Sequence, residues 1–311
     1  MKCLRPITVN GQTYNCGSCI NCRINHTSEW AIRLLFELNN WSFASFVTLT
    51  YNNENLPKDF SLHPEHLKNF LDCVRYDLSL QKRKFKYYAV GEYGEDNSNS
   101  PPGIQHGRPH YHLIMFGLNP DPSDKNNHDR QLIIDNWKKC EDFLFVWKKK
   151  HNAIDFVNRE DIAYVTGYVQ KKLNGKLGAE YYGDRVRPFS RCSLGMGLDY
   201  AIKNQNMLRD LGYIMFNGHK IGIPRYFREK LDIKQTELVK DVNIKKIDVE
   251  CKYLYGLFTQ DMKKRGLWRE GMPDYMQRRF IAWYDNHMYE LSTRVEKDFM
   301  QKNKIVGGKF Q

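Results

Sequence analysis

Two histidines stand one residue apart at the start of the apolar run RPHYHLIMFG, residues 108 to 117. If this run is a β-strand, His110 and His112 project from one face of the sheet and Tyr111 points to the other. Two neutral imidazoles then converge on one point and are candidate metal ligands. Histidine pairs at this spacing also occur by chance, so a third group is needed to indicate a site.

A carboxylate on the preceding strand-like run is the first candidate for that third group. Antiparallel pairing of residues 86 to 93 with the histidine run, across the loop at 94 to 108, would bring Glu92 beside both imidazoles. Two imidazoles and one carboxylate leave open positions that suit Mg²⁺ or Mn²⁺ holding an anionic substrate oxygen, and Zn²⁺ would fit the same ligands. Gln105 and His106 also lie near the motif and are alternative third ligands.

A second set of reactive side chains lies in DIAYVTGYVQKKL. On a helix, Tyr164 and Tyr168 share a face, which Lys171 and Lys172 continue. An ordinary amphipathic helix with packed tyrosines and solvated lysines gives the same pattern. A phenol has an unperturbed pKa of about 10, so a tyrosine nucleophile needs a metal-bound phosphate and a nearby lysine to stabilise the charge that develops.

Four of the eight cysteines gather near the N-terminus, at Cys3, Cys16, Cys19 and Cys22. The last three form C-x2-C-x2-C, and a fourth upstream thiolate would complete a tetrahedral zinc site. An iron–sulfur cluster would use the same ligands, and free thiols in a turn around Gly17 are the third interpretation.

The charge balance indicates an anionic partner. The chain carries 48 Lys and Arg against 36 Asp and Glu, a formal charge of +12, which suits nucleic acid, although such a charge can serve solubility alone. No apolar run approaches the roughly 20 residues of a membrane span, and the N-terminus lacks the apolar core of a signal peptide. We expect a cytosolic protein.

Strand-like and helix-like patterns alternate in a β-α-β-β-α-β order. We expect the strands at 45–51, 86–93, 109–117 and 153–157, and the helices at 63–80 and around 130–140. Further helices are expected at 25–40 and 159–173. This order predicts an α+β fold with a split βαβ, ferredoxin-like antiparallel sheet that carries helices on one face.

The pattern changes after about residue 190. Asn217-Gly218 between two strand-like arms predicts a hairpin, and residues from about 246 onward are charged and helical. We therefore expect a Cys-rich segment at 1–25, a catalytic domain at 26–190 and a basic region at 191–311 that ends in helices.

The HYH strand, a carboxylate on its neighbour and a Y-x3-Y-x3-K helix resemble the HUH endonucleases, specifically the rolling-circle replication initiators. The segments CGSCINCRINHTSEWAIR, FVTLTY, VGEYG, RPHYHLIMFG and YVTGYVQKK, in this order, are similar to the replication initiators of gokushoviruses, small single-stranded DNA phages. NGHKIGIPRYF resembles a downstream segment of the same family. The resemblance covers about residues 16 to 226.

The resemblance implies a fold, a reaction and the residues that perform it. His110 and His112 match the metal-binding histidines, Tyr164 and Tyr168 match the two nucleophile positions, and Lys172, rather than Lys171, matches the lysine of the catalytic helix. Such enzymes nick single-stranded DNA at the viral origin, keep the 5′ end as a phosphotyrosyl ester, leave a 3′-OH primer and rejoin the released strand. The family also implies Mg²⁺ or Mn²⁺, host helicase and DNA polymerase as partners, and the host bacterial cytoplasm as location.

Three rival classes remain open from the sequence. An HUH transposase or plasmid initiator shares the chemistry but uses other flanking motifs. A histidine-triad nucleotide hydrolase needs a third alternating histidine, and position 114 is Ile. A non-catalytic single-stranded nucleic-acid-binding protein would stack aromatic side chains on bases, with Lys and Arg along the backbone.

Overall fold

The computed structural model of the chain describes residues 3–94, 107–121, 123–124, 127–139, 154–171, 179, 181–216, 218–234 and 237–302. The chain divides into two compact units. The sheet unit consists of residues 26–205, and the terminal unit consists of residues 1–25 and 206–311.

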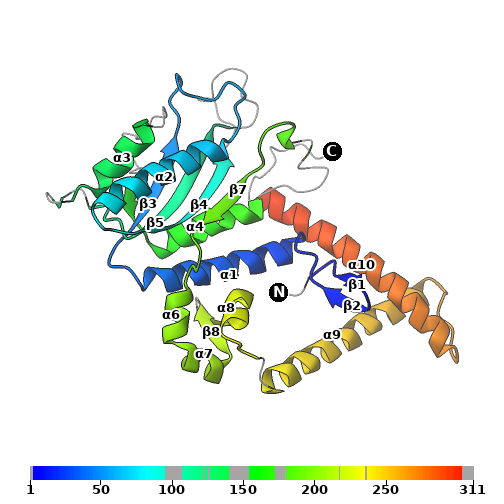
Figure 1. Ribbon diagram of the computed structural model, residues 1–311. Coiled ribbons are helices and arrows are strands. Elements are labelled where there is room, and N and C mark those ends of the chain that lie inside the picture. The colour runs from blue at the N-terminus through cyan, green and yellow to red at the C-terminus, as the bar shows by residue number, and fades with distance from the viewer. Residues whose placement is uncertain are drawn as a thin grey trace. The chain divides into compact units, whose positions relative to one another are not determined.

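A five-stranded antiparallel sheet forms the centre of the sheet unit (Figure 1). Its order is β6-β3-β5-β4-β7, with bounds Ile154–Phe156, Ala44–Thr50, Pro109–Phe116, Lys86–Tyr93 and Phe189–Cys192. Strand β5 lies between β3 and β4 and is antiparallel to both. Strands β3 and β4 are therefore parallel to each other around an inserted strand, which is a split βαβ unit. The expected α+β class with an antiparallel sheet is confirmed.

Helices α2 (Pro64–Leu80) and α3 (Asp129–Lys139) cover one face of this sheet (Figure 1). Every second residue of β3, such as Val47 and Leu49, is buried in the core on this face, because successive strand side chains alternate between faces. Helix α2 contributes an apolar stripe at helical spacing, whose buried members are Leu67, Phe70, Leu71, Val74 and Leu78. Burial of one such side chain stabilises the fold by roughly 1.5–3 kcal/mol.

Helices α1 (Ile20–Leu38) and α4 (Arg159–Lys171) lie on the other face (Figure 1). The ring of Trp30 on α1 lies 4.9 Å from that of Tyr88 on β4, and the hydroxyl of Thr27 donates to the carbonyl oxygen of Thr166 on α4. Helices thus cover both faces, because α1 and α4 fall outside the β-α-β-β-α-β run on which the one-face expectation rested. Helix α6 (Leu198–Lys203) also belongs to this unit.

Helix α1 begins five residues before the expected start at residue 25. The apolar spacing after Trp30 predicted the helix, but its first turn is polar and contains a cysteine. Ile20 and Cys22 are nevertheless buried, in a core with the other N-terminal cysteines. The first turn is therefore stabilised by tertiary packing, which a local pattern does not reveal.

The terminal unit consists of small hairpins and long helices. Its elements, with α7 at the boundary, are β1 (Ile7–Val9), β2 (Gln12–Tyr14), α7 (Gln205–Leu211), β8 (Tyr213–Phe216), β9 (His219–Gly222), α8 (Arg225–Lys230), α9 (Glu237–Lys264) and α10 (Pro273–Lys302). The pairing of Phe216 with His219 forms the hairpin that Asn217-Gly218 predicted, and Gly218 has a φ of 75°. Helices α9 and α10 pack through a core centred on Phe258. Among the described residues, no helix has the length and apolar character needed to cross a bilayer.

Candidate active site

The register of three strands places a glutamate, two histidines and a threonine next to one another. His110 of β5 lies opposite Glu92 of β4, and His112 of β5 lies opposite Thr48 of β3. All four side chains belong to the face covered by α1 and α4, because His110 and His112 are two residues apart in one strand. The backbone hydrogen bonds of the sheet therefore fix their relative positions.

Glu92, His110 and His112 form a compact triad. Glu92 Oε1 lies 2.8 Å from His110 Nε2 and 3.3 Å from His112 Nε2, and the two Nε2 atoms are 3.2 Å apart. The side chains of Glu92 and His112 are buried, and that of His110 is 14% exposed. One nitrogen from each ring and one carboxylate oxygen thus meet at a point with limited access to solvent.

The outer nitrogen of each ring is held by the protein. His110 Nδ1 donates to the Arg108 carbonyl oxygen at 3.0 Å, because a carbonyl can only accept. His112 Nδ1 lies 2.9 Å from Thr48 Oγ1, which can accept its proton. These contacts leave Nε2 of both rings as the nitrogen with a lone pair for a metal ion, the usual arrangement around histidine ligands.

Burial and charge act in opposite directions on the triad. Burial raises the pKa of Glu92, but the two neighbouring imidazoles outweigh burial and lower it to about 2. Burial lowers the pKa of the His110 imidazole, but the Glu92 carboxylate and the Arg108 carbonyl outweigh that effect and raise it. Glu92 is therefore a carboxylate at neutral pH, and in the absence of a metal ion it favours the protonated form of His110.

The residues present fit a divalent cation. All three ligand atoms lie within 4.8 Å of one another, and the set consists of two imidazole nitrogens and one carboxylate oxygen. Such a mixed set suits Mg²⁺ or Mn²⁺ and also Zn²⁺. Three protein ligands leave coordination positions for oxygen atoms of a substrate.

Tyr164 on helix α4 borders the triad. Its ring centroid lies 5.2 Å from that of His112, in an edge-to-face arrangement, and 6.3 Å from that of Phe46. Phe46 in turn stacks on His112 with 5.6 Å between the ring centroids. Tyr164 is 48% exposed, so its ring touches the triad while a large part of the side chain faces solvent.

The other residues proposed for the catalytic helix are described less fully. Tyr168 and Lys171 lie within α4, and Tyr168 follows Tyr164 by about one helical turn. Lys172, together with the alternative ligands Gln105 and His106, lies outside the described residues. The structure thus places Glu92 and Tyr164 beside the histidine pair.

Sequence reasoning missed the groups that orient the triad. Thr48 stands in the segment FVTLTY and faces His112 only because β3 pairs with β5 in this register. The Arg108 carbonyl also accepts the N–H of Gly94 at 3.0 Å, which closes the neck of the β4–β5 hairpin beside the site. Gly107 adopts a φ of 65°, and a Cβ there would lie 1.7 Å from the Gly94 oxygen, so the neck requires glycine.

The N-terminal cysteines form a second cluster of candidate ligands, in the terminal unit. The sulfur atoms of Cys3, Cys16, Cys19 and Cys22 lie within 4.8 Å of one another. Cys3, Cys19 and Cys22 are buried, and all four are free thiols. Burial raises the pKa of the Cys16 thiol, but the N–H of Cys19 and the Ser18 hydroxyl outweigh burial and lower it to about 6.

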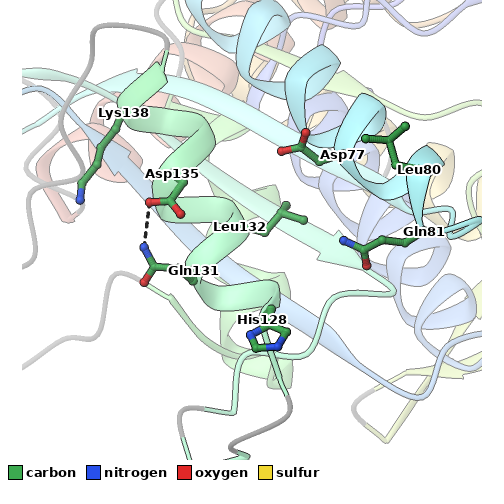
Figure 2. Close-up of a pocket in the computed structure, with 8 residues that line it drawn as sticks. All are labelled: Asp77, Leu80, Gln81, His128, Gln131, Leu132, Asp135 and Lys138. Atoms are coloured by element: carbon green, nitrogen blue, oxygen red, sulfur yellow. Dashed lines mark hydrogen bonds between the residues drawn. The ribbon is translucent and has the colours of Figure 1, made fainter.

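A surface groove between α2 and α3 offers no comparable convergence (Figure 2). It is lined by Asp77, Leu80, Gln81, His128, Gln131, Leu132, Asp135 and Lys138. Gln131 donates to Asp135 within α3, and Asp77 accepts from Asn136. Its polar groups point along the helix surfaces, so the triad on the other face of the sheet is the stronger candidate.

Comparison with known proteins agrees with this placement. Residues 44–173, from β3 to the end of α4, match a family model of phage-type replication-associated proteins, described under the name ORF2. This region contains the complete triad and Tyr164. No solved structure matches the chain.

Three phage proteins resemble the chain over 70% of its length. They are the replication-associated proteins ORF2 of Spiroplasma virus 4 (28% identical over 232 residues), ORF4 of Chlamydia phage 1 (27% over 224) and VP4 of Bdellovibrio phage phiMH2K (28% over 226). The matched segments span 67%, 53% and 66% of these relatives, so the chain covers about half to two thirds of their lengths. The resemblance seen in the sequence motifs is confirmed, and the chain is a relative of gokushovirus-like phage replication-associated proteins.

Proposed function

We propose that this protein initiates rolling-circle replication of a phage genome as an HUH endonuclease. In this proposal it nicks single-stranded DNA at the viral origin with a tyrosine nucleophile. Glu92, His110 and His112 hold a divalent cation, Mg²⁺ or Mn²⁺, and Tyr164 and Tyr168 are the nucleophiles. The family match and the three phage relatives support the role in replication.

One observation carries the proposal: a half-exposed tyrosine lies directly against a buried ligand triad. The Tyr164 ring contacts the ring of His112, whose Nε2 is one of the three ligand atoms. Because the triad is fixed by strand register and α4 packs on the same face, tyrosine and ligands are held by two rigid elements. Such preorganisation is what a reaction between a phenol and a bound phosphate requires.

The protein's groups have distinct tasks in this reaction. The Tyr164 oxygen attacks phosphorus, a new P–O bond forms to the tyrosine, and the bond from phosphorus to the 3′ oxygen breaks. The phenol loses its proton, and the departing 3′ oxygen takes one up to become a 3′-OH. A bound cation supplies stabilisation of charge on the phosphate oxygens. Thr48 and the Arg108 carbonyl keep both imidazoles oriented.

Two tyrosines one turn apart fit a reaction that must cut twice. The second cut, which releases a unit-length strand, takes place while the first tyrosine is esterified to DNA. We propose that Tyr164 and Tyr168 alternate as nucleophile and leaving group at one metal site, and that Lys172, with Lys171 as the alternative, stabilises the transition-state charge. Gly167 between them, where an added Cβ would meet no atom within 4 Å, leaves space for a local adjustment.

The partners follow from the same chemistry. Single-stranded origin DNA is the proposed substrate, and the formal charge of +12 supports binding to its phosphates. A free 3′-OH would serve host DNA polymerase, with host helicase separating the strands, in the cytoplasm of the bacterial host.

The proposal is tested by cleavage of labelled oligonucleotides that tile the viral genome strand. We expect one tile to be cut in Mn²⁺ or Mg²⁺, to give a free 3′-OH and protein-linked 5′ product, and to remain intact in EDTA. The matched control is Tyr76→Phe, which changes an exposed tyrosine of α2 on the opposite face of the sheet and should leave cleavage intact. Binding of the tiles without any cleavage would favour the non-catalytic DNA-binding alternative.

A further inference from the structure

The four N-terminal cysteines have the spacing of ligands around one metal ion. Cys3 Sγ lies 3.5 Å from Cys16 Sγ and 3.9 Å from Cys19 Sγ. With zinc–sulfur bonds of about 2.3 Å, the edges of a tetrahedron of thiolates measure about 3.8 Å. A disulfide requires about 2.05 Å between sulfur atoms, so these contacts are not disulfides.

The compactness of the cluster selects a single ion over a multi-iron cluster. All four sulfurs lie within 4.8 Å of one another. An iron–sulfur cluster distributes its thiolates over two or more iron atoms, which spreads the ligands apart. Four protein thiolates around one ion also leave no open position, which is typical of structural zinc sites and not of catalytic ones.

Backbone N–H groups surround the sulfurs as they do in metal–thiolate sites. Leu4 donates to Cys19 Sγ at 3.4 Å, Cys16 to Cys3 Sγ at 3.2 Å and Cys19 to Cys16 Sγ at 3.3 Å. Such donors offset the negative charge of thiolates and fix their directions. The backbone of the segment is therefore already shaped around the four sulfur atoms.

The hairpin between these cysteines has no core of its own. Strands β1 and β2 contain three residues each, and all six are exposed. A two-stranded hairpin is marginally stable at best in water. Cys3 lies before this hairpin and Cys16 lies after it, so the cysteine cluster ties both of its ends.

The cluster also packs against a helix from the far end of the chain. Ile20 and Leu4 form a small core with Met288 of α10, with Leu291 and Val295 partly buried against it. We propose that Cys3, Cys16, Cys19 and Cys22 bind one Zn²⁺ in a closed tetrahedral site. The ion fastens the exposed β1–β2 hairpin to the start of α1 and completes the core shared with α10.

The test uses the full chain with the triad removed, His110→Ala/His112→Ala, so that only the cysteine site can hold a transition metal. Purified without chelator, this protein should contain about one zinc per chain, and Cys19→Ser on the same background should contain less than about a tenth of that. Cys251→Ser, at an exposed cysteine of α9, is the matched control and should keep its zinc.

Cobalt provides a readout that does not depend on how a cysteine variant folds. Metal-free, reduced protein titrated with Co²⁺ should develop the intense visible absorption of a tetrahedral thiolate site, saturate at one equivalent and lose the signal on addition of Zn²⁺. Stoichiometric iron in the purified protein, or zinc content unchanged in Cys19→Ser, would overturn the proposal. Absence of both zinc and cobalt binding in the reduced protein would overturn it as well.

Discussion

The two ligand clusters of this protein are built in opposite ways. Glu92, His110 and His112 stand on adjacent strands of a five-stranded sheet, so backbone pairing positions them whether or not an ion is bound. The cysteines stand on a turn, on a helix start and before an exposed hairpin, where little besides the sulfurs themselves holds the segment. A site that performs chemistry on a rigid sheet differs from a site that supplies the structure itself.

Removing the histidines should therefore abolish activity and leave the fold intact. We expect His110→Ala/His112→Ala to reduce cleavage of origin single-stranded DNA by at least about 1,000-fold, because the charge on the phosphate is no longer stabilised. DNA affinity should change by less than about threefold, since many dispersed basic side chains contact the backbone. Cleavage by this variant at the wild-type rate after treatment with EDTA would place the metal site elsewhere.

The tyrosines should show a different pattern, because two residues serve one site. Tyr164→Phe and Tyr168→Phe should each retain cleavage of a short oligonucleotide, and the double substitution should retain none. Either single change should impair strand release and circle closure, which gel analysis of circular products measures. If Tyr168→Phe closes circles as well as the wild type, one tyrosine performs both cuts and the alternating mechanism fails.

Removing a cysteine ligand should have the reverse effect of removing the histidines. If the zinc site is present, Cys19→Ser should lower the melting temperature by about 5 °C or more and expose residues 3–19 to protease, because metal-binding energy is folding energy in such sites. Cys251→Ser is again the control. An unaltered melting curve and digestion pattern would show that the hairpin is held without the metal.

The pH dependence of metal binding should also separate the two clusters. The Glu92 carboxylate raises the pKa of His110 above its ordinary value of about 6.5, and only the neutral imidazole binds a metal ion. Mn²⁺ affinity at the triad should therefore fall as the pH drops through a range that begins above 6.5. Calorimetric titration between pH 5 and 8 measures this, and Glu92→Gln, which removes the charge that raises the pKa, should shift the range downward. A flat profile would mean that His110 is not a ligand.

The smallest effect is expected from a residue that touches no substrate. Thr48→Val removes the hydroxyl that contacts His112 Nδ1 while keeping the side-chain shape. Loss of such a partner weakens metal binding by about 10-fold, at the low end of the range for groups that orient a metal ligand. Because only orientation is lost, saturating Mn²⁺ should restore cleavage, and failure of that rescue would assign Thr48 a role beyond positioning.

The sequence allowed much of the sheet unit to be predicted, because its elements have strong local periodicity. The alternation in β3, β4 and β5 indicated which residues share a face, and the β-α-β-β-α-β order indicated how the strands pair. Position 92 was accessible to this reasoning since a hairpin register relates it to position 110. The side of the sheet covered by α1 and α4 was not, because their packing depends on contacts such as Thr27 with Thr166, 139 residues apart.

The supporting groups were hidden for a related reason. A backbone carbonyl such as that of Arg108 has no signature in the residue type, and Thr48 is one of several threonines until the β3–β5 register selects it. The early start of α1 depends on burial of Ile20 beside the cysteines and Met288, which the spacing of one segment cannot show.

The most direct test of the central claim, that the triad activates the tyrosine beside it, is mass spectrometry of the protein–DNA adduct. Wild-type protein incubated with origin single-stranded DNA and Mn²⁺ should yield one phosphotyrosyl peptide at Tyr164 or Tyr168, and His110→Ala/His112→Ala should yield none. An adduct at another residue, or an adduct that persists in the histidine variant, would contradict the account.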